Sequence, residues 1–319
     1  MSPNKQTKFT CRVQAATAAA GFAAFFAVHS ACAQQLSAQG ASQGTAQLSA
    51  HIAVPAPGPS GAAKPLTPFQ PGGAAGAAPV ACVAPTELVH FEQPLVHTMR
   101  QLANGQPLTV VAIGSSSTAG AGASSPDASY PSRLAVELRG RFPGRDITVF
   151  NRGVNGEETT NMMARFGADV IAAHPQLVLW QIGTNSVLRD HPLSPHGAQL
   201  HQGIEQLKAT GADVVLIDPQ FAPAVLAKSE TQGMVEQIAI TAKEENVDLF
   251  QRFAVMRNWH DAQHLSFDVF VSQDRLHMND WSYACLAKLL GNAIAEAASR
   301  PIASAAVHPA MISTKPDLH

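Results

Sequence analysis

Charge is scarce in this sequence. Of the 319 residues, 14% are Asp, Glu, Lys or Arg, and the formal net charge is −2. No basic stripe marks a nucleic-acid surface and no long acidic run marks a solvating tail, so partners that need a strong electric field are not expected. Aromatic residues make up only 6%, but hydrophobic residues reach 46%, which is ample for the core of one large domain or two modest ones.

The apolar run near the amino terminus is short and rich in alanine, which disfavours a transmembrane anchor. The run covers residues 15–28 and is preceded by a positively charged segment. Ala31-Cys32-Ala33 follows the run and supplies the small residues that a signal peptidase recognises. The pattern predicts a secretory signal peptide over residues 1–33 and therefore a periplasmic or extracellular protein. No twin-arginine pair is present, so we expect the chain to cross the membrane unfolded and without a cofactor. Lipidation of Cys32 is a minor alternative.

Cysteine is nearly absent from the predicted mature chain. Of four cysteines, Cys11 and Cys32 fall within the predicted signal peptide, which leaves Cys82 and Cys285. Two cysteines in an oxidising compartment favour a disulfide, which here joins the ends of the folded region across a loop of about 200 residues. Two separately buried thiols are the alternative.

Periodicity is missing from both ends of the mature chain. Residues 34–81 are mainly Ala, Gly, Pro, Ser and Gln, and residues 299–319 have the same character. Such segments cannot bury enough apolar surface to offset the entropy lost on ordering. We therefore expect a flexible linker over 34–81, one folded domain over 82–298 and a loose tail over 299–319.

Between these ends, short apolar runs alternate with segments of helical periodicity. The alternation favours a parallel sheet covered by helices on both faces, and right-handed crossovers then make a three-layer, doubly wound α/β domain with a five-stranded sheet. The predicted strands are 108–113, 147–151, 177–182, 214–217 and 247–250, and the predicted helices are 86–103, 130–141, 159–173, 195–210, 234–245 and 280–298.

Small and polar residues follow the first three predicted strands. The three segments are Gly114-Ser115-Ser116-Ser117-Thr118-Ala119-Gly120, residues 151–157, and Gly183-Thr184-Asn185-Ser186. Since the carboxyl ends of parallel strands share one edge of a sheet, a serine, a glycine turn and an asparagine can meet there. A fourth segment, Asp274-Arg275-Leu276-His277, precedes the last predicted helix.

These residue types supply the parts that acyl transfer needs. A serine hydroxyl becomes nucleophilic when a base removes its proton and a third group orients that base. Asp274 and His277 are three residues apart, which suits a helical turn or tight loop in which the carboxylate orients the imidazole. The Gly156 N–H, the Asn185 amide and the N–H of the serine can bind the oxyanion of a tetrahedral intermediate. Each signal is weak alone, but four in this order are strong.

In these motifs, residues 107–298 resemble the SGNH hydrolase superfamily, which includes the GDSL esterases and lipases. The resemblance implies a flavodoxin-like α/β/α sandwich and ester hydrolysis through a covalent acyl-enzyme, without a metal or other cofactor. It also implies roles for individual residues. These are the nucleophile Ser116, the oxyanion donors Ser116, Gly156 and Asn185, and the Asp-x-x-His pair Asp274 and His277.

The first motif departs from the family pattern, because Ser115 stands where an aspartate is usual. Three adjacent serines also leave the register of the nucleophile to be decided. Ser116 is favoured, because it places Thr118 and Gly120 where the pattern Gly-Asp-Ser-x-Thr-x-Gly has them. Ser115 and Ser117 are then turn hydroxyls that bond to the backbone.

Proteins of other classes compete with an esterase. In a flavodoxin-like binding module, residues 115–118 would hold a flavin phosphate at a helix amino terminus, but Asp274 and His277 would then have no role. A catalytically silent ester- or glycan-binding protein on the same fold is another alternative. A metal site is not expected: His260 and His264 are spaced to share a helix face, but no glutamate follows His260 as in the zincin motif.

We therefore predict an exported serine esterase that needs no cofactor. Its expected substrates are short acyl esters of small molecules or polysaccharides, such as acetylated polysaccharides. No nucleic-acid partner is expected, and no stable membrane anchor is expected once the signal peptide has been cleaved.

Overall fold

The computed structural model describes residues 80–300 of the chain. The predicted signal peptide and nearly all of the predicted linker and tail lie outside this range. Contacts extend the folded unit slightly beyond the predicted domain over 82–298. The Val80 carbonyl accepts the Trp281 indole N–H at 3.2 Å, and the Arg300 guanidinium donates to the Glu92 carbonyl at 3.1 Å.

Five parallel strands form the central sheet, as predicted. They are β1 (Leu108–Gly114), β2 (Ile147–Gly153), β3 (Leu177–Gln181), β4 (Asp213–Ile217) and β5 (Asp248–Phe250). Their order is β2-β1-β3-β4-β5, which is the flavodoxin-like order. The order reverses between β1 and β3, and open α/β sheets bind ligands at such a point, beyond the carboxyl ends of the strands.

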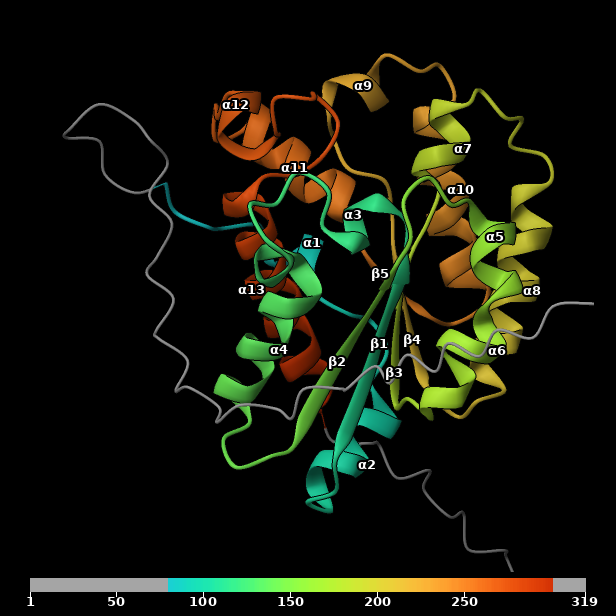
Figure 1. Cartoon of the computed structure of the whole chain (residues 1–319), viewed down its shortest axis with the longest axis vertical. Helices are drawn as coiled ribbons and strands as arrows, with labels where there is room; N and C mark the ends of the chain where they lie inside the picture. The colour runs from blue at the N-terminus through green and yellow to red at the C-terminus, as the bar shows by residue number, and fades with distance from the viewer. Residues whose placement is uncertain (1–79, 301–319) are drawn as a thin grey trace, which may run out of the picture. The chain divides into compact units, whose positions relative to one another are not determined.

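Helices cover both faces of the sheet, and each face has its own core. In β1, Val110 and Ala112 belong to the core of one face, whereas Val111 and Ile113 belong to the core of the other. Burial of both faces explains the nearly continuous apolar runs of the inner strands β1, β3 and β4. On one side in Figure 1 lie α4 (Tyr130–Arg141) and α13 (Asp280–Ala297), and on the other lie α5 (Thr159–Ala164), α6 (Phe166–Asp169), α8 (His196–Lys208) and α10 (Thr231–Glu244).

Two predicted helices are interrupted. The segment predicted as one helix over 86–103 forms α1 (Thr86–Val89) and α2 (Val96–Ala103). Pro94 explains the break, because it has no backbone N–H and disfavours a helical conformation in the residue before it. The segment 159–173 forms α5, α6 and the 3-10 turn η2 (Ile171–Ala173), and the first break is at Arg165, where φ is −109° and ψ is 6°.

Several helices that were not predicted from the sequence gather beyond the carboxyl ends of the strands (Figure 1). Most have only four or five residues, which is too short for a hydrophobic period to be recognised. They are α3 (Ser116–Ala119), α7 (Thr184–Leu188), α9 (Pro223–Leu226), α11 (Arg252–Asp261) and α12 (Phe267–Phe270). A short 3-10 turn, η1 (Pro126–Ala128), precedes α4.

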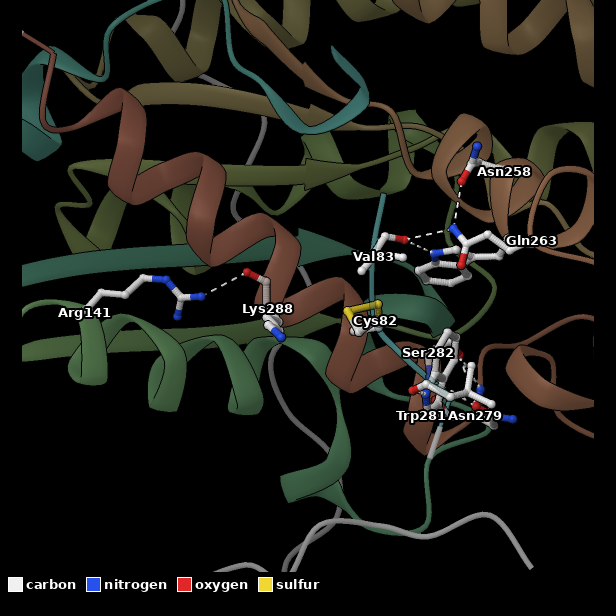
Figure 2. Close-up of a disulfide and its surroundings, with 12 residues drawn as sticks. Cys82, Val83, Arg141, Asn258, Gln263, Asn279, Trp281, Ser282 and Lys288 are labelled. Carbon is white, nitrogen blue, oxygen red and sulfur yellow. Dashed lines mark hydrogen bonds between the residues drawn. A yellow bond between two sulfur atoms is a disulfide. The ribbon is translucent and has the colours of Figure 1, made fainter. Parts of the chain in front are cut away.

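A disulfide joins the first described residues to the last helix, which confirms the favoured prediction. Cys82 and Cys285 are bonded across a sequence separation of 203. Figure 2 shows the neighbouring Val83, whose carbonyl accepts hydrogen bonds from the Trp259 indole at 3.0 Å and the Gln263 amide at 3.2 Å. The segment that contains Cys82 and Val83 therefore connects α11 to α13.

Among residues 80–300, no helix has both the length and the apolar character needed to cross a membrane.

Candidate active site

Ser116 differs from the serines on either side of it in exposure. Ser115 and Ser117 are 1% and 0% exposed, whereas Ser116 is only half-buried. The N–H and Oγ of Ser115 both donate to Gln181 Oε1, at 2.9 and 3.0 Å. Ser117 Oγ donates to Gln220 Oε1 at 3.3 Å. The two outer hydroxyls are therefore bonded to side chains inside the protein rather than to the backbone as expected, and Ser116 is the serine that a substrate can reach.

Close packing positions Ser116 at the start of α3, directly beyond β1. A Cβ atom at Gly114 would stand 2.2 Å from Thr118 Oγ1, and one at Gly153 would stand 2.0 Å from the Ala119 nitrogen. Real Cβ atoms do not approach other atoms so closely, so α3 can lie against the ends of β1 and β2 because both positions are glycine. The Ser116 hydroxyl is thereby held at the carboxyl edge of the sheet, beside the switch point.

His277 contacts Ser116 although the two residues are 161 positions apart in the sequence. Its Nε2 atom lies 2.8 Å from Ser116 Oγ, and its side chain is 15% exposed. The approach depends on Gly122, which has φ +86° and where a Cβ atom would lie 2.4 Å from the Met278 carbonyl oxygen and 2.9 Å from the His277 Cβ. Glycine at this position lets the loop that carries His277 pack against the segment that follows α3.

Asp274 orients His277 within a tight loop. Asp274 Oδ2 lies 2.6 Å from His277 Nδ1, while Oδ1 accepts the backbone N–H groups of Leu276 and His277 at 2.9 Å each and the Ser272 hydroxyl at 2.6 Å. Burial opposes the charge of Asp274, but these hydrogen bonds outweigh it and hold the pKa of the carboxyl well below its ordinary value. An ionised Asp274 favours the imidazole tautomer with its proton on Nδ1, which leaves Nε2 as the acceptor for Ser116.

The base of this loop is closed by backbone pairing. Val271 and Met278 form an antiparallel bridge, and the Ser272 N–H donates to the His277 carbonyl at 2.8 Å. Arg275 takes a left-handed conformation with φ 61°, which turns the chain between Asp274 and His277. The three-residue spacing therefore corresponds to a tight loop rather than to a helical turn.

The loops that carry Gly156 and Asn185 are bonded to each other. Asn185 Nδ2 donates to the Glu157 carbonyl at 2.8 Å, and the Val154 N–H at the start of the same loop donates to the Gly114 carbonyl at 3.0 Å. Gly156 has φ +78°, a conformation that glycine adopts without the cost that a side chain adds. These bonds bring the predicted glycine and asparagine to the edge of the sheet where Ser116 lies.

Arg189 and Glu158, which the sequence analysis did not single out, strengthen this arrangement. Arg189 donates to the Gly156 carbonyl at 2.7 Å and to Glu158 Oε1 at 2.6 Å. Glu158 also accepts hydrogen bonds from Ser186 and His191, each at 2.9 Å. Burial opposes the charge of Glu158, but the hydrogen bonds outweigh it and lower the pKa of its carboxyl. No sequence spacing pointed to this network, because its partners come from different loops.

His260 and His264 do not share a helix face, contrary to the spacing argument. Helix α11 ends at Asp261, and His264 takes a left-handed conformation with φ 57°. The His260 ring instead stacks on Phe267 with centroids 4.2 Å apart. Within residues 80–300, no three His, Cys, Asp or Glu side chains are grouped in a way that would hold a metal ion.

Comparison with protein families gives a match over residues 81–300 to the Non-GDSL lipase-like family. Among curated proteins, an arylesterase from Vibrio mimicus is 34% identical over 95 residues, which cover 30% of this chain and 46% of the relative. An acetylxylan esterase from Geobacillus stearothermophilus is 34% identical over 87 residues, which cover 27% of this chain and 39% of the relative. The chain thus spans less than half the length of these two curated relatives.

Solved structures share the fold. A two-domain esterase active on acetylated mannans is 18% identical, with a TM-score of 0.57, and the match covers 66% of this chain and 56% of that chain. A mutant of an acetylxylan esterase from Geobacillus stearothermophilus is 22% identical, with a TM-score of 0.51 and coverage of 59% and 94%. At these identities the likeness concerns the fold alone.

Proposed function

Because the chain belongs to the Non-GDSL lipase-like family, we propose that it is a carboxylic ester hydrolase of the SGNH type with the catalytic triad Ser116, His277 and Asp274. The family match agrees with the resemblance to the SGNH and GDSL enzymes noted in the sequence. One observation carries the proposal: a continuous line of contacts runs from Asp274 through His277 to Ser116, with distances of 2.6 and 2.8 Å. A nucleophile in reach of a base, with the base oriented by a carboxylate, is the arrangement that acyl transfer requires.

In the proposed reaction, Ser116 Oγ attacks the ester carbonyl carbon while His277 Nε2 accepts the hydroxyl proton. The tetrahedral intermediate collapses, His277 returns the proton to the leaving alcohol oxygen, and the acyl group remains on Ser116. A water molecule then attacks the acyl carbon, His277 accepts a proton from it, and the acid departs as Ser116 recovers its hydrogen. Asp274 stays ionised throughout and stabilises the imidazolium form of His277.

We propose that the Ser116 N–H, the Gly156 N–H and the Asn185 amide bind the oxyanion. Such donors accelerate the reaction when they are held in place before charge develops, because no reorganisation is then needed. The bond from Asn185 to the Glu157 carbonyl at 2.8 Å supports this role, since it holds the amide beside the loop of Gly156. The Arg189 contact to the Gly156 carbonyl at 2.7 Å supports it as well.

The proposed substrates are short acyl esters of carbohydrates, acetyl esters above all. A curated relative is an acetylxylan esterase, and an esterase of the same fold with a solved structure is active on acetylated mannans.

We also propose that the protein is exported. The Cys82–Cys285 disulfide supports this proposal because structural disulfides persist mainly in oxidising compartments.

The test compares the purified full chain with Ser116→Ala on chromogenic esters of increasing chain length and on acetylated xylo- and manno-oligosaccharides. We expect Ser116→Ala to lose about 10³-fold or more in kcat, the scale of a triad knockout. A serine-directed phosphonate should label the wild type on the peptide that contains Ser116. Ser132→Ala, in α4, is the matched control. Undiminished hydrolysis by Ser116→Ala, or a label on another serine, contradicts the proposal.

A further inference from the structure

Gln220 lies behind the candidate site, in the segment between β4 and α9, and is 0% exposed. None of the sequence motifs contains it. Its side-chain amide nevertheless bonds to three different segments: α3, α7 and the loop that carries His277. Oε1 accepts the hydroxyls of Thr184 at 3.0 Å and Ser117 at 3.3 Å, and Nε2 donates to the Leu276 carbonyl at 3.2 Å.

The three partners of Gln220 have one property in common. Each is the immediate sequence neighbour of a different residue of the candidate site. Ser117 follows Ser116, Thr184 precedes Asn185, and Leu276 precedes His277.

The contact to Leu276 holds the peptide unit that joins Leu276 to the proposed base, His277. The peptide unit between Leu276 and His277 is held at both polar atoms: its carbonyl accepts from Gln220 at 3.2 Å, and its N–H donates to Asp274 at 2.9 Å. A peptide unit is planar, so two fixed ends determine its orientation and the direction in which the His277 side chain leaves the backbone. The neighbouring Arg275 carbonyl accepts the Ala224 N–H at 3.0 Å, which also bonds this loop to α9, the helix that follows Gln220.

We propose that Gln220 is a positioning residue that sets the relative placement of the nucleophile, the base and the oxyanion asparagine. The inference rests on the proposed ester hydrolysis. An amide is suited to this role because one oxygen can accept from two hydroxyls while the nitrogen donates to a carbonyl. An apolar side chain of similar size leaves those three buried groups unpaired, and the loops must move to find other partners. Displacement of catalytic groups by about 1 Å lowers a rate by about 10²-fold.

The test replaces Gln220 with methionine, which keeps the length of the side chain and removes all three hydrogen bonds. We expect Gln220→Met to lower kcat about 10- to 100-fold with KM within about threefold, because the groups are displaced but the binding surface remains. Phosphonate labelling of Ser116 should slow in parallel, since it reports nucleophile activation without ester turnover.

Gln176 provides a control at the opposite edge of the sheet, where its side chain is partly exposed. Its Oε1 accepts the Thr109 N–H at 2.9 Å and its Nε2 donates to the His174 carbonyl at 2.9 Å. Gln176→Met should keep the wild-type kcat, because neither of its hydrogen-bond partners adjoins a residue of the candidate site. A kcat of Gln220→Met within about twofold of wild type, or an equal fall in the control, overturns the inference.

Two milder variants cover the case in which Gln220→Met does not fold. Thr184→Val keeps the shape of the side chain and removes one hydroxyl, and Ser117→Ala removes the other. Each should lower kcat by about three- to tenfold, and their effects should not add, because both hydroxyls donate to the same oxygen. A wild-type kcat in both variants overturns the inference.

Ser116→Ala shows which proposal has failed. If Ser116→Ala hydrolyses esters as fast as wild type, the proposed function itself fails, whereas an inactive Ser116→Ala confines the failure to the role of Gln220.

Discussion

Asp274 holds His277 at two points, because Oδ2 lies 2.6 Å from the ring nitrogen Nδ1 and Oδ1 accepts the backbone N–H of the same residue at 2.9 Å. The first contact orients the imidazole and the second fixes the backbone from which it extends. One carboxylate therefore sets both the tautomer and the position of the group that contacts Ser116.

The first prediction concerns the charge of Asp274. Asp274→Asn keeps a side chain of the same shape but cannot hold the Nδ1 proton with a negative charge, so the imidazole loses its preferred tautomer. We expect kcat to fall about 10³- to 10⁴-fold, as when a triad carboxylate is neutralised in serine proteases. Steady-state ester hydrolysis measures the effect. Asp268→Asn, an exposed aspartate in α12, should retain the wild-type rate, and an unaffected Asp274→Asn would remove Asp274 from the triad.

The second prediction concerns stability at low pH. The pKa of Asp274 in the folded protein lies below its ordinary value of 3.8 because hydrogen bonds to the carboxylate outweigh the effect of burial. The unfolded chain therefore binds more protons as the pH falls, and the stability from this group, complete above the ordinary pKa, is lost as the pH drops through the lower one. Scanning calorimetry from about pH 5 to about pH 2.5 should show a steeper loss of Tm for wild type than for Asp274→Asn. Parallel curves would count against the hydrogen-bonded carboxylate.

The third prediction uses two glycines with nearly the same φ angle. Gly156 has φ +78° and Gly144 has φ +76°, and a Cβ atom at Gly144 would meet no atom within 4 Å. Alanine at either position costs about 1–2 kcal/mol in the left-handed region. Gly156→Ala should also displace its N–H from the oxyanion and lower kcat about 10²-fold or more. Gly144→Ala should lose stability only, so equal kcat values in the two variants would contradict the role of Gly156.

The fourth prediction concerns the disulfide. Because Cys82 and Cys285 are separated by 203 residues, their bond restricts nearly the whole domain in the unfolded state. Cys82→Ala/Cys285→Ala should lower the free energy of unfolding by about 2–5 kcal/mol. Urea titration should show that a reductant lowers the stability of wild type to that of the double variant and has no effect on the double variant itself. Equal stability with and without reductant in wild type would show that the bond does not form.

Sequence patterns predicted the inner strands β1, β3 and β4 well because these strands are buried on both faces. Continuous apolar runs such as 108–113 leave little choice of structure, and the observed β1 differs from that prediction by one residue. The short helices at the edge of the sheet were not predictable in this way. Helix α3 has four residues, and its place depends on close packing against Gly114 and Gly153 rather than on its own periodicity.

Supporting residues left no sequence signal for a different reason. Gln181 and Gln220 are ordinary glutamines in the sequence, and their hydrogen bonds run to residues 66 and 103 positions away. Partners at such separations are chosen by the order of the strands, which brings the ends of β1, β3 and β4 together. Local patterns do not contain that information.

The sequence by itself determined the three-layer architecture and the chemical composition of the candidate site, because burial periodicity and the types of residue beyond each strand are local properties. Motif spacing favoured Ser116 among the three adjacent serines, but only tertiary structure decided that its hydroxyl reaches His277 while its neighbours do not. Ser115 and Ser117 are drawn into the protein by Gln181 and Gln220, and Ser116 remains at the surface 2.8 Å from His277. That choice depends on contacts between distant segments, which exist only once the sheet has assembled.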